Sequence, residues 1–149
     1  MKDEIRKQFE QAISKAHGRD VAAEQAQQKR ASEREEFEAN YERTAEKVIL
    51  PALKEVAQEV LEPAGWGTDV GCIDPDVTVR LAIRRGEIRS MIGGHPTIFF
   101  SRCRFDPKVL VSVETRSYQG DESYRLDQIT ADFVHQRALS FFEKVAAGH

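Results

Sequence analysis

Seven arginines are the residues of this chain whose type and spacing are best suited to chemistry, and that chemistry is the binding of anions. They are Arg80, Arg84, Arg85, Arg89, Arg102, Arg104 and Arg116. The planar guanidinium suits phosphates and carboxylates because it donates two parallel hydrogen bonds. All except Arg85, which falls at a predicted hairpin tip, are expected on one face of a β-sheet, because strand side chains alternate between faces. The sequence therefore predicts a basic face for an acidic partner or a nucleic-acid backbone.

The same arginines also have a purely structural explanation. Glu87 and Glu114 are expected on the same face, and an acidic row follows one side of a predicted helix. The members of that row are Glu38, Glu42 and Glu46. The row would cover the arginines within one chain or across a dimer, and charge runs are usually matched or solvated in this way. Internal or dimer matching is the favoured explanation, and ligand binding stays as the second.

A cysteine and a histidine form the one pair that suggests nucleophilic catalysis. A catalytic thiolate needs a lowered pKa and a nearby imidazole, and Cys103 lies in a cationic strand with His95 in the loop before it. Cys103 is, however, expected on the core face, where a free cysteine usually acts as a small apolar residue. No catalytic residue is therefore predicted, and a small enzyme built around this pair is only a third hypothesis.

The sequence contains no recognisable pattern for a metal or a cofactor. Its four histidines and two cysteines are scattered and lack the spacing of known metal sites. Asp74-Pro75-Asp76 predicts a turn and not a calcium loop, because alternating oxygen ligands are absent. Neither glycine-rich nucleotide motif occurs. We expect no metal and no cofactor.

The composition limits the possible classes of protein. The 149 residues suffice for one domain, or for a smaller domain with an arm, and 32% of them are charged. A net charge of -3 does not by itself indicate a nucleic-acid binder. No apolar run is long enough to span a membrane, the start Lys2-Asp3-Glu4 is charged, and no CxxC pair occurs. A cytoplasmic location without a membrane is the expectation.

The segment Thr97–Ser117 is predicted to be the central β-hairpin of the fold. Two runs rich in β-branched and aromatic residues flank the turn pair Asp106-Pro107. With a three-residue loop at 106–108, one face carries Phe99, Ser101, Cys103, Phe105, Val109, Val111, Val113 and Thr115. The other face then carries Arg102 and Arg104 together with Ile98 and Phe100, which indicates that another element covers part of the arginine side.

Helical patterns dominate the N-terminal part of the chain. Apolar residues at Ile5, Phe9, Ala12 and Ala16 predict an amphipathic helix, with Gly18 either ending it or lying inside a longer one. Residues 21–36 offer almost nothing to bury and need a partner helix or stay solvated. Residues 33–61 give the best helical pattern, with a kink or restart at Pro51. Residues 62–65 end this helix, and Trp66 is expected to anchor on the core.

The remaining segments predict four further elements. Strands are expected from Val77 to Arg84, from Glu87 to Ile92 and, after a turn at 119–121, from Glu122 to Leu126. The last helix has Thr130 as its N-cap. Its predicted buried stripe consists of Val134, Ala138, Phe141, Phe142 and Val145.

The sequence therefore predicts an α+β protein with a helical arm, a long kinked helix, an antiparallel sheet of about five strands and a closing helix. Residues 1–36 would form the arm and residues 37–149 the domain. The leading hypothesis is a non-enzymatic binding or adaptor module, dimeric through the arm and presenting the arginine-rich face to an acidic partner. The alternative is a nucleic-acid-binding protein that uses the arginine strands and the hairpin tip.

Overall fold

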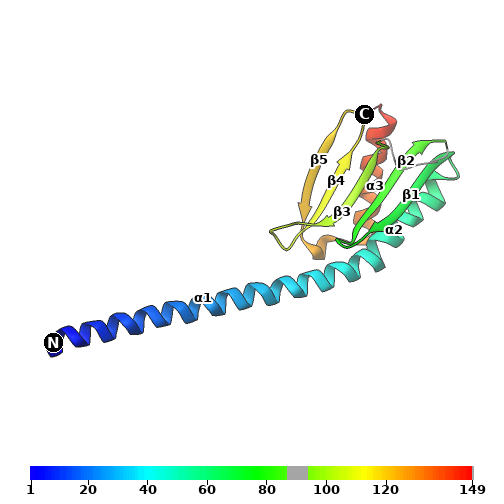
Figure 1. Ribbon diagram of the computed structural model, residues 1–149. Helices are drawn as coiled ribbons and strands as arrows, with labels where there is room; N and C mark the ends of the chain where they lie inside the picture. The colour runs from blue at the N-terminus through cyan, green and yellow to red at the C-terminus, as the bar shows by residue number, and fades with distance from the viewer. Residues whose placement is uncertain (87–93, 149) are drawn as a thin grey trace. The chain divides into compact units, whose positions relative to one another are not determined.

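The fold is α+β, as the sequence predicts, and a computed structural model describes residues 1–86 and 94–148 of it. The described chain forms two units, residues 1–37 and residues 38–149. A long helical segment comes first, followed by a five-stranded antiparallel sheet and a C-terminal helix (Figure 1). The predicted strand Glu87–Ile92 and its Arg89 lie outside the described residues.

Helix α1 runs from Asp3 to Thr44, so Gly18 lies inside one long helix and does not end it. The helical path continues through η1 (Ala45–Ile49), α2 (Leu50–Glu55) and η2 (Val56–Leu61). At Pro51, where a kink or restart was predicted, the backbone stays helical, and the proline lies in the first turn of α2 directly after the π-helical η1. The wider π turn suits a proline, which lacks the amide hydrogen needed for a regular helical bond. Gly65, with φ of 91°, follows the helix end as predicted.

The sheet has the strand order β1-β2-β3-β4-β5, so every strand pairs with its neighbour in sequence. The strands are β1 (Trp66–Ile73), β2 (Thr78–Arg85), β3 (Thr97–Arg102), β4 (Val109–Glu114) and β5 (Gln119–Tyr124). Helices α2 and α3 lie on the same side of this sheet (Figure 1). We call this side the helix face of the sheet and the other side the open face.

Alternating strand residues build the core on the helix face. Val79 and Leu81 of β2 pair with residues of both β1 and β3, Ile83 pairs with Thr68 of β1, and all three are essentially inaccessible to solvent. Helix α3 (Ala131–Ala146) lies on the same face and contributes Val134, Ala138 and Phe141 to the core, the buried members of its predicted stripe. The predicted N-cap is confirmed, because the Thr130 hydroxyl accepts a hydrogen bond from the Phe133 amide at 3.2 Å.

The register predicted for the central hairpin is wrong. Phe100 pairs with Val111 and Arg102 with Val109, so the connection spans six residues, 103–108, in place of three. This change shifts the pairing by an odd number of residues, and an odd shift moves every β3 side chain to the opposite face. Ile98 and Phe100 are therefore in the core, whereas Phe99 and Ser101 lie on the open face.

Two more details of the sheet differ from the prediction. Trp66 does pack on the core, edge-on to Phe142 with ring centroids 5.0 Å apart, but it also begins the unpredicted strand β1. The last hairpin turns at residues 115–118, earlier than the predicted turn at 119–121. The Thr115 amide donates a hydrogen bond to the Tyr118 carbonyl oxygen at 2.8 Å. Gly120, expected in that turn, lies within β5, next to the Tyr118 ring. A Cβ atom on Gly120 would stand only 2.5 Å from the Tyr118 hydroxyl oxygen.

Candidate functional site

The predicted arginine face is not a single surface. Arg80 and Arg84 project from the open face of β2, where Arg80 lies 3.9 Å from Asp69. Arg85 lies on the helix-face side and stacks over Trp66 at 5.7 Å. Arg104 and Arg116 are exposed in the loops at opposite ends of β4. The arginines are separated for two reasons. The changed register moves Arg102 to the other face from Arg80 and Arg84, and β3 and β4 end at Arg102 and Glu114, before Arg104 and Arg116.

Arg102 lies on the helix face and is matched within the chain. Its guanidinium is 3.5 Å from the Glu38 carboxylate and 3.7 Å from that of Asp76. The predicted acidic row thus reaches one arginine through Glu38, while Glu42 and Glu46 are exposed. Only a fifth of the Arg102 side chain is exposed, so the main effect of this cluster is to join α1, the β1–β2 turn and β3.

Cys103 and His95 are at opposite ends of strand β3. Six strand residues separate them, which corresponds to roughly 25 Å at the rise of an extended chain. The two side chains therefore cannot form a nucleophile and base pair. The other cysteine, Cys72, is exposed, and partial burial together with nearby Asp74 raises the pKa of its thiol, which favours the unreactive thiol form.

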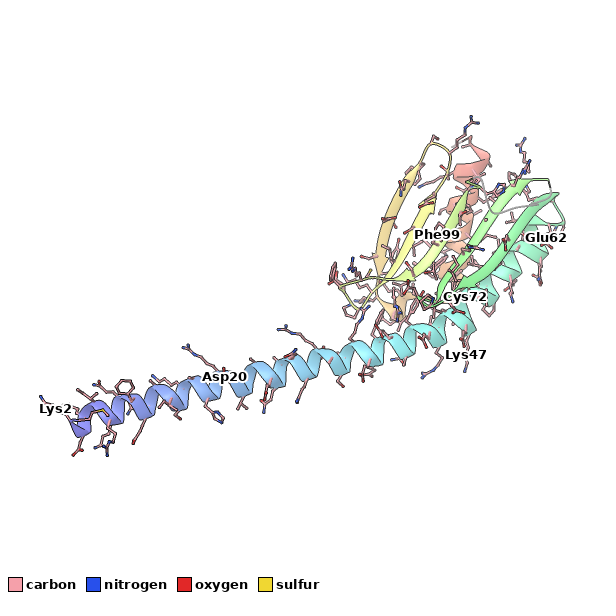
Figure 2. The ribbon with its side chains drawn as sticks, in the orientation of Figure 1. Lys2, Asp20, Lys47, Glu62, Cys72 and Phe99 are labelled. Atoms are coloured by element: carbon pink, nitrogen blue, oxygen red, sulfur yellow. The ribbon has the colours of Figure 1, made fainter. Side chains whose placement is uncertain are left out.

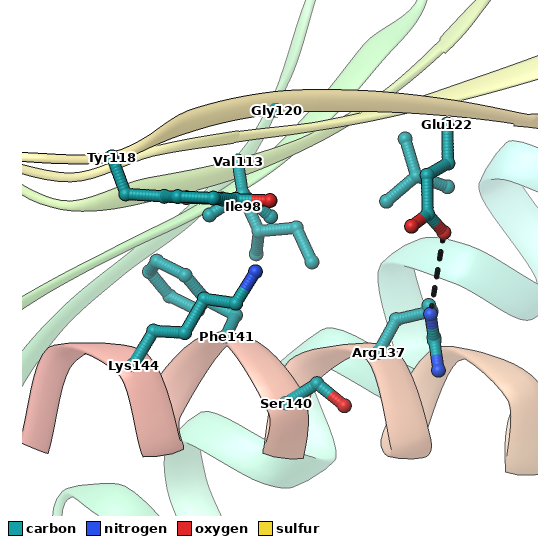
Figure 3. Close-up of a pocket in the computed structure, with 10 residues that line it drawn as sticks. Ile98, Val113, Tyr118, Gly120, Glu122, Arg137, Ser140, Phe141 and Lys144 are labelled. Carbon is teal, nitrogen blue, oxygen red and sulfur yellow. Dashed lines mark hydrogen bonds and ion pairs between the residues drawn. The ribbon is translucent and has the colours of Figure 1, made fainter. Parts of the chain in front are cut away.

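A small pocket with charged groups at its two ends, which the sequence did not reveal, lies between α3 and the β4–β5 hairpin (Figure 3). Its volume is about 50 Å³, and Ile98 and Phe141 form its apolar floor. Arg137 lies at one end, 3.5 Å from Glu122 and 3.3 Å from the Tyr124 hydroxyl. Lys144 lies at the other end, with its ammonium 3.7 Å from the centre of the Tyr118 ring. The pocket is thus small, and both of its cations already contact protein groups.

A larger apolar groove lies between the helical segment Glu55–Leu61 and helix α3. Its volume is about 260 Å³. Val56, Val60, Leu139 and Phe142 provide most of its apolar wall, and Val60 and Leu139 are 60% and 56% exposed. The sequence signal for this groove was the very wide apolar stripe of residues 33–61. The domain buries Ile49, Leu53, Ala57 and Leu61 from that stripe and leaves Val56 and Val60 toward the outside.

The helical unit 1–37 carries a second exposed apolar surface. Ile5, Phe9 and Ile13 are 43%, 61% and 66% exposed and follow one another at intervals of four residues. Figure 2 shows the side chains of this unit standing out from the helix between Lys2 and Asp20. A spacing of four residues places the three side chains on one side of a helix. We call these three residues the arm stripe.

The described residues include no group of three or more His, Cys, Asp and Glu side chains placed to hold a metal ion. Within the same residues, no helix combines the length and apolar character needed to cross a membrane. No family model matches the chain, and neither the curated proteins nor the solved structures contain a match to it.

Proposed function

We propose that this protein is a non-enzymatic binding or adaptor module that associates with itself through its helical arm and presents basic residues of the domain to an acidic partner. The observation that carries this proposal is the exposed arm stripe. A helix that has apolar side chains on one side and nothing within its own unit to cover them gains stability by packing against another helix. The distance between Cys103 and His95 removes the best catalytic pair that the sequence offered.

The partner-binding part of the proposal is supported by the exposed arginines that remain outside the Arg102 cluster. Arg84 is exposed on the open face, and Arg104 is exposed in the β3–β4 loop. Neither residue has a carboxylate within ion-pair distance among the described residues. Exposed guanidinium groups such as these suit a carboxylate-rich surface, because the planar fork donates two parallel hydrogen bonds to a carboxylate.

A nucleic-acid partner is the second candidate, and one observation favours it. Phe105, at the tip of the β3–β4 loop, is 86% exposed, and the Arg104 guanidinium stacks 5.4 Å from its ring centre. An exposed aromatic ring beside a cation is suited to stacking on an unpaired base while the cation contacts phosphate. Binding of a single-stranded oligonucleotide that weakens steeply with salt would support this candidate over an acidic protein.

The test of self-association is the mass of the full chain in solution, by light scattering over a dilution series. The double variant Phe9→Glu/Ile13→Glu places two charges in the arm stripe and is expected to shift the protein to a monomer. The matched control is Gln11→Glu/Ser14→Glu, which adds the same charge on the other side of the helix and should keep the wild-type mass. Equal masses for wild type and the Phe9→Glu/Ile13→Glu variant at every concentration would refute association through the arm.

A further inference from the structure

The groove between the segment Glu55–Leu61 and α3 has a shape and an apolar lining that suit the binding of one more helix. Buried Leu61 and Ala138 form its base, while Val60 and Leu139 stand more than half exposed on its two walls. Packing between helices depends on such a depression between two parallel ridges of side chains. The groove residues of α3, from His135 to Phe142, span about two helical turns at 1.5 Å per residue.

The charged residues at the groove show what kind of helix would fit. Glu55 and Glu59 both line it, and the described lining residues include neither lysine nor arginine. The only other ionisable lining residue is His135, whose Nε2 atom is 3.4 Å from the Glu55 carboxylate. A helix whose apolar side is accompanied by positive charges therefore complements this groove, because opposite charges at the edge of an interface fix register and orientation.

The arm of this same protein has those properties. Its stripe runs from Ile5 to Ile13, which is also about two helical turns. Lys2, Arg6 and Glu10 precede Ile5, Phe9 and Ile13 by three residues each, so two cations and one carboxylate lie on the side of the arm stripe. The two cations lie at its N-terminal end. The exposed apolar residues of the arm and of the groove thus match in length, and the Lys2–Arg6 pair, which makes the stripe side of the arm net positive, is opposite in charge to Glu55 and Glu59.

We propose that the groove binds the first turns of the arm from a second copy of the chain, with Ile5, Phe9 and Ile13 packed between Val60 and Leu139. This proposal rests on the proposed self-association and names the surface that receives the arm. Two copies that exchange arms in this way form two identical contacts, and such a closed symmetric pair leaves no arm and no groove unfilled. Lys2 and Arg6 then lie toward Glu55 and Glu59.

Disulfide trapping between two distinguishable full-length chains tests the arrangement. Both chains carry Cys72→Ser and Cys103→Ser, one adds Phe9→Cys, and the other adds Leu139→Cys and a mass tag. Mixing and mild oxidation should give the mixed disulfide as the main product. Gln11→Cys, on the other side of the arm helix, replaces Phe9→Cys as the control and should give at least tenfold less product.

The other products separate this inference from the function on which it rests. A Phe9→Cys disulfide between two arms as the main product would overturn the groove arrangement but leave association through the arm standing. The third product is a disulfide within one chain that carries both Phe9→Cys and Leu139→Cys. If it forms while light scattering gives a monomer, both the groove arrangement and association through the arm are refuted. A dimer that survives Phe9→Glu/Ile13→Glu and gives no mixed disulfide would also refute both.

A charge exchange gives an independent measurement on the full chain. Glu55→Lys/Glu59→Lys should weaken self-association by about tenfold, because it brings like charges together in the complex. Adding Lys2→Glu/Arg6→Glu should restore most of the loss, whereas Lys7→Glu/Lys15→Glu, with the same net charge change elsewhere on the helix, should not. Equal effects of the two arm variants would contradict the proposed pairing.

Discussion

The hydroxyl of Tyr41 donates a hydrogen bond to the carbonyl oxygen of Val77 at 2.6 Å, across 36 residues of sequence. Tyr41 is fully buried, and its hydroxyl also lies 3.1 Å from the Phe100 carbonyl oxygen. Val77 has a positive φ of 53°, a conformation that β-branched residues avoid. One side chain of α1 thus satisfies the backbone of a strained turn and touches the central strand, and it ties together the same elements as the Arg102 cluster.

Tyr41→Phe is expected to lower the free energy of unfolding by about 1–3 kcal/mol, because it leaves a buried carbonyl without its donor. Denaturant unfolding of the full chain measures the loss. The control is Tyr118→Phe, which removes the hydroxyl of a tyrosine that is 39% exposed and should change stability by less than about 0.5 kcal/mol. Similar losses in the two variants would show that the buried hydrogen bond contributes little.

Stability should also fall in alkaline solution because of Tyr41. Burial raises the pKa of its phenol above the ordinary value of 10.0. Above pH 10 the unfolded chain loses this proton while the folded chain keeps it, so the unfolded state binds fewer protons and stability decreases as pH rises. The unfolding free energy of wild type should approach that of Tyr41→Phe by up to about 1.4 kcal/mol per pH unit there. A constant difference between the two proteins from pH 8 to 11 would contradict the assignment.

Val77 is expected to reverse the usual ranking of alanine and glycine. At an ordinary strand position glycine is less stable than alanine by about 0.5–1 kcal/mol. At φ of 53° the alanine variant keeps the strain and the glycine variant removes it, so Val77→Gly should be at least as stable as Val77→Ala. Val70, within β1, is the control position, where the glycine variant should be the less stable one. The usual ranking at both positions would argue against strain at Val77.

Gly120→Ala should destabilise the β4–β5 hairpin by about 1 kcal/mol, the low end of the range for added methyl groups, because the partly exposed Tyr118 ring must move aside. The loss should largely disappear when Tyr118 is first replaced by alanine, which a double-mutant cycle in thermal unfolding would measure. Gly71→Ala is the matched strand control, since a Cβ atom there meets nothing within 4 Å. A loss that persists without the tyrosine ring would assign the effect to the backbone.

The elements that the sequence predicts well are those with a strong local signal. The helix ending before Gly65 and the helix starting at Thr130 depend on neighbouring residues, and the structure confirms both. Strand β1 was missed because Gly67, Asp69 and Gly71, which occupy every second position, are residue types that strands disfavour. As an edge strand it needs only one partner, and it is stabilised by pairing with β2 more than by its own composition.

The sites were harder to predict, because they depend on register and on contacts distant in sequence. The length of the β3–β4 loop decides the face on which Arg102 lies, and Asp106-Pro107 alone does not distinguish three loop residues from six. The small pocket combines Arg137 and Lys144 with Tyr118 and Glu122, and no spacing rule connects those segments. The groove had a sequence signal in its excess of apolar helix residues, but the sequence could not show which of them the domain leaves uncovered.

The sequential strand order has a consequence for synthesis on the ribosome. Each hairpin, from β1–β2 to β4–β5, contains only residues that are close in the chain, so each is able to form soon after it is translated, with little loop entropy to overcome. The apolar side of this nascent sheet stays partly bare until Val134, Ala138 and Phe141 emerge. The emergence of helix α3 is therefore the step that ends the exposure of this face of the sheet to chaperones and to aggregation.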